Sequence, residues 1–153
     1  CMAIKTALEA GGISVQVVDN INVMMWEKFL GFACNATIAS LTRSRAGVIA
    51  RTIDGARFVS EVIGECAKVV TALGYPPLPA FNTAGIVAGV FSQPDSTYGP
   101  SLLIDMEEGR PTEGEHTVGD LAGRAVKAGI SAPLLTAARC NLQAYEINRS
   151  NPK

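Results

Sequence analysis

Residues 23–41 read VMMWEKFLGFACNATIASL, and the architecture can be predicted outward from this segment. Apolar side chains occupy most faces of a helix drawn through these residues, which is typical of a helix at the centre of a domain. Asp19 or Asn22 is suited to cap its start, so we expect a buried helix from about there to Leu41. Its uncharged part, Phe29 to Leu41, has 13 residues, whereas a membrane-spanning helix needs about 20. We therefore expect a core helix and no membrane span.

Helical periodicity also dominates the rest of the chain, and turn residues divide the whole into about seven pieces. The clearest amphipathic pattern runs from Asp54, a capping residue, to Leu73. Another begins with a capping box, TEGE from Thr112, and continues to Ala128. We predict that each of these two is one continuous helix. Shorter helices are expected before Gly11 and at residues 80–91, 101–108 and 133–148. The fold class is therefore all-α, with about seven helices and no sizeable sheet.

The composition fits one folded domain and excludes several kinds of partner. Of the 153 residues, 48% are hydrophobic and 18% are charged, which argues against disorder. The formal net charge is −1 and no dense basic run occurs, so nucleic acid is not an expected partner. Four cysteines and one histidine are scattered without a CxxC pair, so we expect no metal site and reduced, buried thiols. Such thiols are typical of a cytoplasmic protein.

Lys28 is the most unusual residue of the central segment. A lysine is rarely buried without a partner or a chemical role, and Lys28 lies in the helix that we expect to be buried. Its stem could instead run along the helix and carry the ammonium to water, which is the commoner outcome for a lone lysine. Asn35 follows two helical turns later and returns to nearly the same azimuth. The two side chains are therefore expected to share one polar strip.

Further polar residues open the later helices. Glu113 would lie in the first turn of the helix that begins at Thr112, where the helix dipole and free amides favour a carboxylate. Ser101 starts a helix directly after Pro100. A plain helix-end charge and a plain cap are the commoner roles for such residues. His116, the only histidine, is expected at the surface and not as a catalytic base.

Two stretches resemble signature sequences of the C-terminal domain of the ketopantoate reductase family. The first is WEKF at residues 26–29, followed by LTR at 41–43, and the second is SLLIDMEEGRPTE at 101–113. The sequence AGISAP at 128–133 also fits. The order and spacing of these stretches cover nearly the whole chain. The resemblance implies a multi-helix domain of the type found at the C-terminus of 6-phosphogluconate dehydrogenase.

The resemblance further implies an enzyme of two domains, in which residues 1–153 form the helical, substrate-side domain. An N-terminal Rossmann domain would hold NADPH, and a 2-keto acid would lie in the cleft between the domains. This chain has no GxGxxG motif in a βαβ frame, so we expect the Rossmann domain to be missing from it and the isolated chain to be inactive. A homodimer is a further expectation.

The family's functional residues fall on three of the residues singled out above. Its catalytic lysine matches Lys28, its paired glutamate matches Glu113, and its substrate-binding serine matches Ser101. The resemblance implies that Lys28 stabilises the developing charge on a ketone oxygen and donates a proton to it. Glu113 would orient that ammonium and contact the nicotinamide ribose of the coenzyme.

The chain departs from the family where a polar substrate would be held. The family's reductases usually carry asparagines four and eight residues after the lysine, and these positions are Phe32 and Ala36 here. Asn35 is a candidate to replace one of them as a substrate-binding residue, in a different register. Two further asparagines of the family are replaced by Val118 and Leu135. We therefore expect a 2-keto acid that is bulkier or less polar than the usual one.

Two other functions remain open at this point. The chain could be a helical association module without catalysis, in which case its apolar excess would reflect a dimer interface. It could also belong to a related opine-type or hydroxyacid-type dehydrogenase that shares the helical fold. The sequence GRPTE at residues 109–113 argues against the last interpretation.

Overall fold

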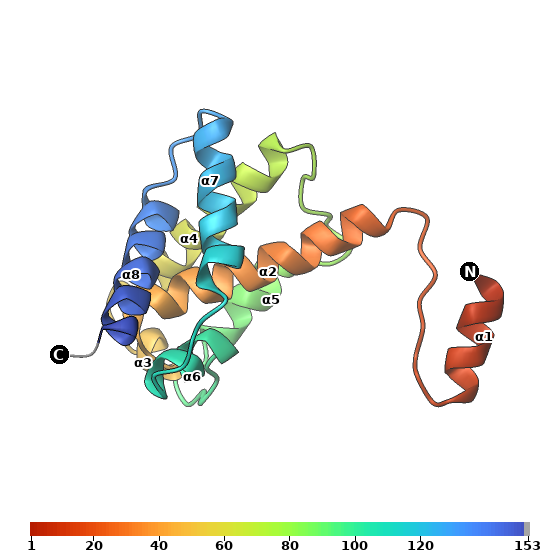
Figure 1. The fold of residues 1–153 in the computed structure, drawn as a ribbon, viewed down its shortest axis with the longest axis horizontal. Coiled ribbons are helices and arrows are strands. Elements are labelled where there is room, and N and C mark those ends of the chain that lie inside the picture. Colours follow the sequence, from red (N-terminus) through yellow and green to blue (C-terminus); the bar gives the residue numbers. More distant parts are fainter. Residues whose placement is uncertain (152–153) are drawn as a thin grey trace.

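The computed structural model describes residues 1–151. Within this range all regular secondary structure is helical, and no β-strand is present. Eight α-helices and one π-helical turn follow one another along the chain (Figure 1). This confirms the all-α prediction and adds one five-residue helix, α3, that the sequence patterns do not flag. The elements are α1 (Met2–Ala10), α2 (Ile21–Thr42), α3 (Ala46–Ala50), α4 (Gly55–Ala72), α5 (Thr83–Val90), α6 (Ser101–Glu107), η1 (Glu115–Gly119), α7 (Asp120–Lys127) and α8 (Pro133–Ser150).

The long helix α2 crosses the middle of the molecule, and α4, α5, α6, η1 and α8 all pack against it (Figure 1). Asn20 caps its start, because the Asn20 side chain accepts hydrogen bonds from the backbone N–H groups of Asn22 and Val23 at 3.1 and 3.4 Å. The cap is therefore Asn20, between the two residues that the sequence suggested. The buried residues of α2 begin at Glu27 and become continuous from Ala36 to Ser40, whereas Ile21, Met25 and Phe32 are exposed. The prediction of burial on most faces is wrong for the residues before Glu27.

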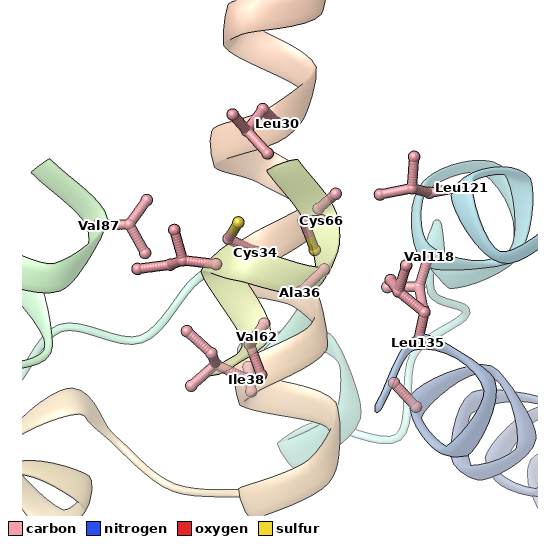
Figure 2. Close-up of a cluster of buried hydrophobic side chains, with 14 of the residues drawn as sticks. Leu30, Cys34, Ala36, Ile38, Val62, Cys66, Val87, Val118, Leu121 and Leu135 are labelled. Carbon is pink, nitrogen blue, oxygen red and sulfur yellow. The ribbon is translucent and has the colours of Figure 1, made fainter. Parts of the chain in front are cut away.

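The hydrophobic core forms where α2, from Leu30 onward, meets the later helices. Figure 2 shows Leu30, Cys34 and Ile38 of α2 facing residues from five other elements. All of these side chains are at least nine-tenths buried, and burial of this kind is the main force that holds such helices together. The partners labelled in the figure are Val62 and Cys66 from α4, Val87 from α5, Val118 from η1, Leu121 from α7 and Leu135 from α8.

The two helices that the sequence predicted most clearly are both present. Helix α4 spans the predicted range, although the Asp54 side chain bonds Arg57 at 2.8 Å and caps no backbone amide. The helix after Thr112 begins with the π-helical turn η1 and continues directly into α7. The predicted capping box is wrong, because the Thr112 backbone N–H and hydroxyl donate to Glu146 of α8 at 2.7 and 2.9 Å.

Helix α1 stands apart from the other helices, at the end of an extended segment (Figure 1). It has no buried residue, and its apolar side chains Met2, Ile4 and Leu8 are exposed. The extended segment also exposes Ile13 and Val17. The helix ends before Gly11, as predicted. None of the helices in residues 1–151 combines the length and the apolar character that crossing a bilayer requires.

All four cysteines are free thiols, and two of them belong to the core. Cys34 and Cys66 are buried side by side between α2 and α4, whereas Cys1 and Cys140 are exposed. A hydrogen bond with Cys34, together with burial, raises the pKa of the Cys66 thiol well above its usual value. The prediction of buried thiols therefore holds for Cys34 and Cys66 and is wrong for the other two.

Candidate functional site

A cleft of about 800 Å³ runs along one side of α2, and it contains the residues that the sequence selected. Helix α2 contributes Lys28 and Asn35, the start of α6 contributes Ser101, and the segment before η1 contributes Glu113. These residues lie far apart in the sequence. They meet because α5, α6 and η1 all pack against α2. A concave, mostly apolar site with a few polar groups is the usual form of a small-molecule site.

Lys28 is exposed in this cleft, which is the commoner of the two outcomes considered from the sequence. Its ammonium nitrogen is 5.6 Å from the centre of the Phe32 ring, one turn further along α2, a distance at which a cation and an aromatic face attract. Within residues 1–151, Lys28 makes no ion pair with a carboxylate. Its charge is therefore available to an anionic ligand.

Asn35 lies in the same cleft as Lys28, as expected for residues on one strip of the helix. Its side-chain nitrogen donates to the carbonyl oxygen of Gly31 at 2.8 Å, which fixes the orientation of the amide. Its side-chain oxygen is enclosed and has no hydrogen-bond donor among the described residues. A buried acceptor without a donor is unusual in a folded protein.

Ser101 and Glu113 carry polar groups that the described part of the chain does not use. Ser101 is the first residue of α6, and its hydroxyl makes no capping bond there. Glu113 lies just before the helix, and its carbonyl oxygen accepts from the N–H groups of His116 and Thr117 at 3.1 and 3.2 Å. Glu113 is therefore at the cap position and not in the first turn. Its carboxylate is exposed to the cleft.

The buried carboxylate of Glu27 was missed by the sequence reasoning. Its side chain is 7% exposed, and no other aspartate, glutamate, lysine or arginine in residues 1–151 is buried. Glu27 accepts hydrogen bonds from the Leu78 backbone N–H and from the Thr83 hydroxyl. It thereby fastens the connector between α4 and α5 to the central helix. The available signal was an acidic residue beside Lys28 in an otherwise apolar helix.

Two other polar residues of the cleft differ in how far they are already engaged. Asp105 of α6 is paired with Arg110, whose guanidinium nitrogens lie 2.8 and 2.9 Å from its carboxylate. Tyr98 packs its ring edge-on against Phe91, and burial raises the pKa of its phenol above the ordinary value. The Tyr98 phenol is therefore protonated at neutral pH and acts as a hydrogen-bond donor.

His116 is exposed and lies outside the cleft, which confirms its expected surface position. Among residues 1–151, no group of three or more histidine, cysteine, aspartate or glutamate side chains could hold a metal ion. The cleft therefore presents one ammonium, two hydroxyls and one unpaired carboxylate beside an apolar surface. Such a set of groups can bind a small anion, donate a proton to it and accept hydrogen bonds from a neighbouring hydroxyl.

Comparison with known proteins gives a consistent result. Residues 20–146 match the family described as ketopantoate reductase PanE/ApbA C terminal. The uncharacterized oxidoreductase YkpB of Bacillus subtilis is 30% identical over 147 residues, which cover 96% of this chain and 48% of that protein. The chain thus spans about half the length of the curated relative that it matches.

Two solved structures share the fold. A dimeric ketopantoate reductase from Staphylococcus aureus has a TM-score of 0.75 at 21% identity, covering 90% of this chain and 47% of that one. D-mandelate dehydrogenase, in a ternary structure with NADH and anilino(oxo)acetate, has a TM-score of 0.78 at 18% identity. That match covers 97% of this chain and 61% of the dehydrogenase.

Proposed function

The chain belongs to the ketopantoate reductase family, as its C-terminal helical domain, and we propose that it forms the substrate side of an enzyme that reduces a 2-keto acid. One observation carries the proposal. Lys28, Ser101 and Glu113, which lie on three separate elements, line a single cleft. Residues that serve only as a surface charge, a helix cap and a helix-end charge would have no reason to meet.

We assign the proton donation to Lys28. A nicotinamide coenzyme supplies the hydride for such a reduction, and negative charge then develops on the ketone oxygen. The Lys28 ammonium stabilises that charge and gives the oxygen its proton, which yields a 2-hydroxy acid. Because Lys28 is exposed and has no carboxylate partner among residues 1–151, it can take up a new proton from water after each turnover.

Ser101, Asn35 and Glu113 hold the reactants in this proposal. The Ser101 hydroxyl donates to the substrate carboxylate, because no other group in residues 1–151 engages it. Asn35 contacts the substrate through the second hydrogen of its side-chain amide, since the other hydrogen is donated to Gly31. Glu113 orients the Lys28 ammonium and accepts hydrogen bonds from the ribose hydroxyls of the coenzyme, for which an unpaired carboxylate is suited.

A nucleotide-binding Rossmann domain is the proposed partner of this helical domain. The matched proteins are about twice as long as the region that they share with this chain. Helix α1 and the extended segment after it expose Met2, Leu8, Ile13 and Val17, which suits a surface that another domain covers. A homodimer is proposed as well, since the S. aureus reductase of the same fold is dimeric.

NADPH is the proposed coenzyme, and the Rossmann domain would hold its phosphates. Residues 1–153 contain no glycine-rich loop between a strand and a helix, which is the usual site for a pyrophosphate. D-mandelate dehydrogenase, which shares the fold, binds NADH. Both coenzymes therefore belong in the assay.

The test uses the two-domain protein and residues 1–153 alone. The two-domain protein should oxidise NADPH when a 2-keto acid is added, which is followed by the loss of absorbance of the reduced coenzyme. Residues 1–153 alone should show no turnover and no NADPH binding by calorimetric titration. If no 2-keto acid supports oxidation of NADPH or NADH, the reductase proposal is wrong and the association module becomes the better interpretation. A micromolar Kd of the isolated domain for NADPH would contradict the assignment of the phosphate site.

A further inference from the structure

We infer that the substrate of this cleft is a 2-keto acid with an apolar side chain, one that carries no hydroxyl or charge beyond the keto acid group. The inference rests on the proposed function and adds the class of substrate to it. Two observations support it. The cleft has an apolar surface, and only a few of its hydrogen-bond donors have no acceptor within residues 1–151.

The apolar residues of the cleft come from α2, from α5 and from Phe81, which lies in the connector before α5. Phe32 of α2 and Ile86 of α5 line the cleft with 55% and 62% of their surfaces exposed. Large apolar side chains that are exposed singly are ordinary, but several of them in one concave site indicate a surface that a ligand covers. Met24, Ala36, Phe81 and Val87 extend the same surface.

Most polar groups beside this apolar surface are already engaged within the chain. The Thr83 hydroxyl donates to Glu27 at 2.5 Å, and Glu27 also accepts from the Leu78 N–H. The Asn35 nitrogen is bonded to Gly31, and the Asn35 oxygen is enclosed. The Thr83 hydroxyl would have to leave Glu27 to bind a hydroxyl on the substrate side chain, and the enclosed Asn35 oxygen is not accessible to one.

The donors that remain match the keto acid group itself. Within residues 1–151, the Lys28 ammonium, the Ser101 hydroxyl and the Tyr98 phenol line the cleft and donate no hydrogen bond. A 2-keto acid has three oxygen atoms, two in the carboxylate and one in the ketone, so three donors can serve these atoms. The apolar residues of the cleft, Phe32 and Ile86 among them, offer no hydrogen bond to a further oxygen on the side chain.

Phe32 is the residue that should discriminate between substrates. It lies one helical turn after Lys28, and its ring centre is 5.6 Å from the Lys28 ammonium nitrogen. A ketone oxygen held at Lys28 therefore brings the substrate side chain, which is bonded to the ketone carbon, close to the Phe32 ring. An aromatic ring attracts a methyl or phenyl group there and offers nothing to replace the water lost from a hydroxyl.

The experiment compares two probes that differ in one group. Ketopantoate has a hydroxyl at the end of its branched side chain, and 3,3-dimethyl-2-oxopentanoate has a methyl group at the same place. With the two-domain protein, kcat/KM should be about 10-fold to 100-fold higher for the methyl probe, the range in which an apolar pocket discriminates against an added hydroxyl.

Two variants on α2 test the role of Phe32 in this discrimination. Phe32→Asn provides an amide in the cleft and should lower the ratio of the two kcat/KM values by at least about 10-fold. Met25→Asn is the matched control, because Met25 is an exposed apolar residue of α2 outside the cleft, and the ratio should not change. Circular dichroism checks that both variants stay folded.

The outcomes separate this inference from the proposed function. If ketopantoate is reduced as well as the methyl probe or better, the protein is a 2-keto acid reductase and the inference about its side chain is wrong. An unchanged ratio in Phe32→Asn, with both variants folded, also overturns the role of Phe32. If neither probe nor any other 2-keto acid is reduced, the proposed function fails, and the inference fails with it.

Discussion

The hydroxyl of Thr83, the first residue of α5, donates a hydrogen bond of 2.5 Å to the carboxylate of Glu27 on α2. The same carboxylate accepts the backbone N–H of Leu78, so one buried side chain holds both the connector between α4 and α5 and the start of α5. Glu27 is the sequence neighbour of Lys28. The residue beside the proposed proton donor therefore holds in place the helix that forms the apolar wall of the cleft.

Replacing Glu27 with alanine should destabilise the domain by about 1–3 kcal/mol, because two donors lose their acceptor in a partly buried site. Urea unfolding followed by circular dichroism measures the loss. Glu61→Ala, on the exposed face of α4, is the control and should change the free energy of unfolding by less than about 0.5 kcal/mol. If Glu27→Ala costs no more than this control, the connector is held by other contacts.

The Glu27 and Thr83 contact can be tested separately with Thr83→Val. Because the valine variant removes one of the two donors, the effects of Glu27→Ala and Thr83→Val should add to more than the effect of the double variant. The expected coupling is about 0.5–3 kcal/mol. Strictly additive effects would mean that the two side chains do not interact in solution.

Lys28→Ala in the two-domain enzyme should lower kcat by about 10²–10⁴, the range for loss of a positioned proton donor. Lys28→Arg should not restore the rate, because a guanidinium keeps its proton at the working pH. Lys68→Ala serves as control, since Lys68 is an exposed lysine of α4 outside the cleft. Steady-state kinetics of a Lys28→Ala enzyme with normal kcat would remove Lys28 from the reaction.

Two glycines should respond in opposite directions to alanine. A Cβ atom on Gly47 of α3 would lie 2.5 Å from the carbonyl oxygen of Ser96 and 2.6 Å from that of Pro94, so Gly47→Ala should destabilise by about 1–3 kcal/mol. A Cβ atom on Gly64 of α4 meets nothing within 4 Å. Gly64→Ala should therefore stabilise by about 0.5–1 kcal/mol, the usual gain inside a helix. Thermal unfolding of both variants, with Tm shifts of the same sign, would contradict this.

The ion pair between Glu115 of η1 and Arg139 of α8 should make stability depend on pH. The hydrogen bond from Arg139 holds the pKa of Glu115 below its usual range. A folded-state pKa below the unfolded value of about 4.3 gives stabilisation that is complete above that value and is lost as pH falls through the folded pKa. Both side chains are more than a third exposed, so the effect at neutral pH should stay below about 1 kcal/mol.

The measurement compares Glu115→Gln with the unchanged chain by urea unfolding at pH 7 and at pH 3. The glutamine variant should be less stable at pH 7, and the difference should shrink at pH 3, toward the range in which Glu115 takes up a proton. High salt at pH 7 should also reduce the difference. A difference that is the same at both pH values would show that the charge on Glu115 contributes nothing.

Much of the fold could be predicted from local pattern. The helix from Gly55 to Ala72 follows from an amphipathic repeat, and the start of α8 follows from Pro133, whose ring suits a first helical turn. Such signals depend on residues within one or two turns of one another. The sequence motifs that resemble the family are equally local, and they point to Lys28, Ser101 and Glu113 without any knowledge of tertiary contacts.

Packing decided the rest, because it depends on residues that are distant in the chain. The start of α2 is as apolar as the rest of the helix, yet its buried residues begin only at Glu27. Thr112 bonds Glu146 of α8 in place of the local capping box, since a carboxylate from another helix reaches the same donors. Glu27 is a buried hydrogen-bond acceptor only because the connector before α5 folds back over it. Local sequence determines which segments become helices, whereas the exposure and partners of each side chain follow from how those helices meet.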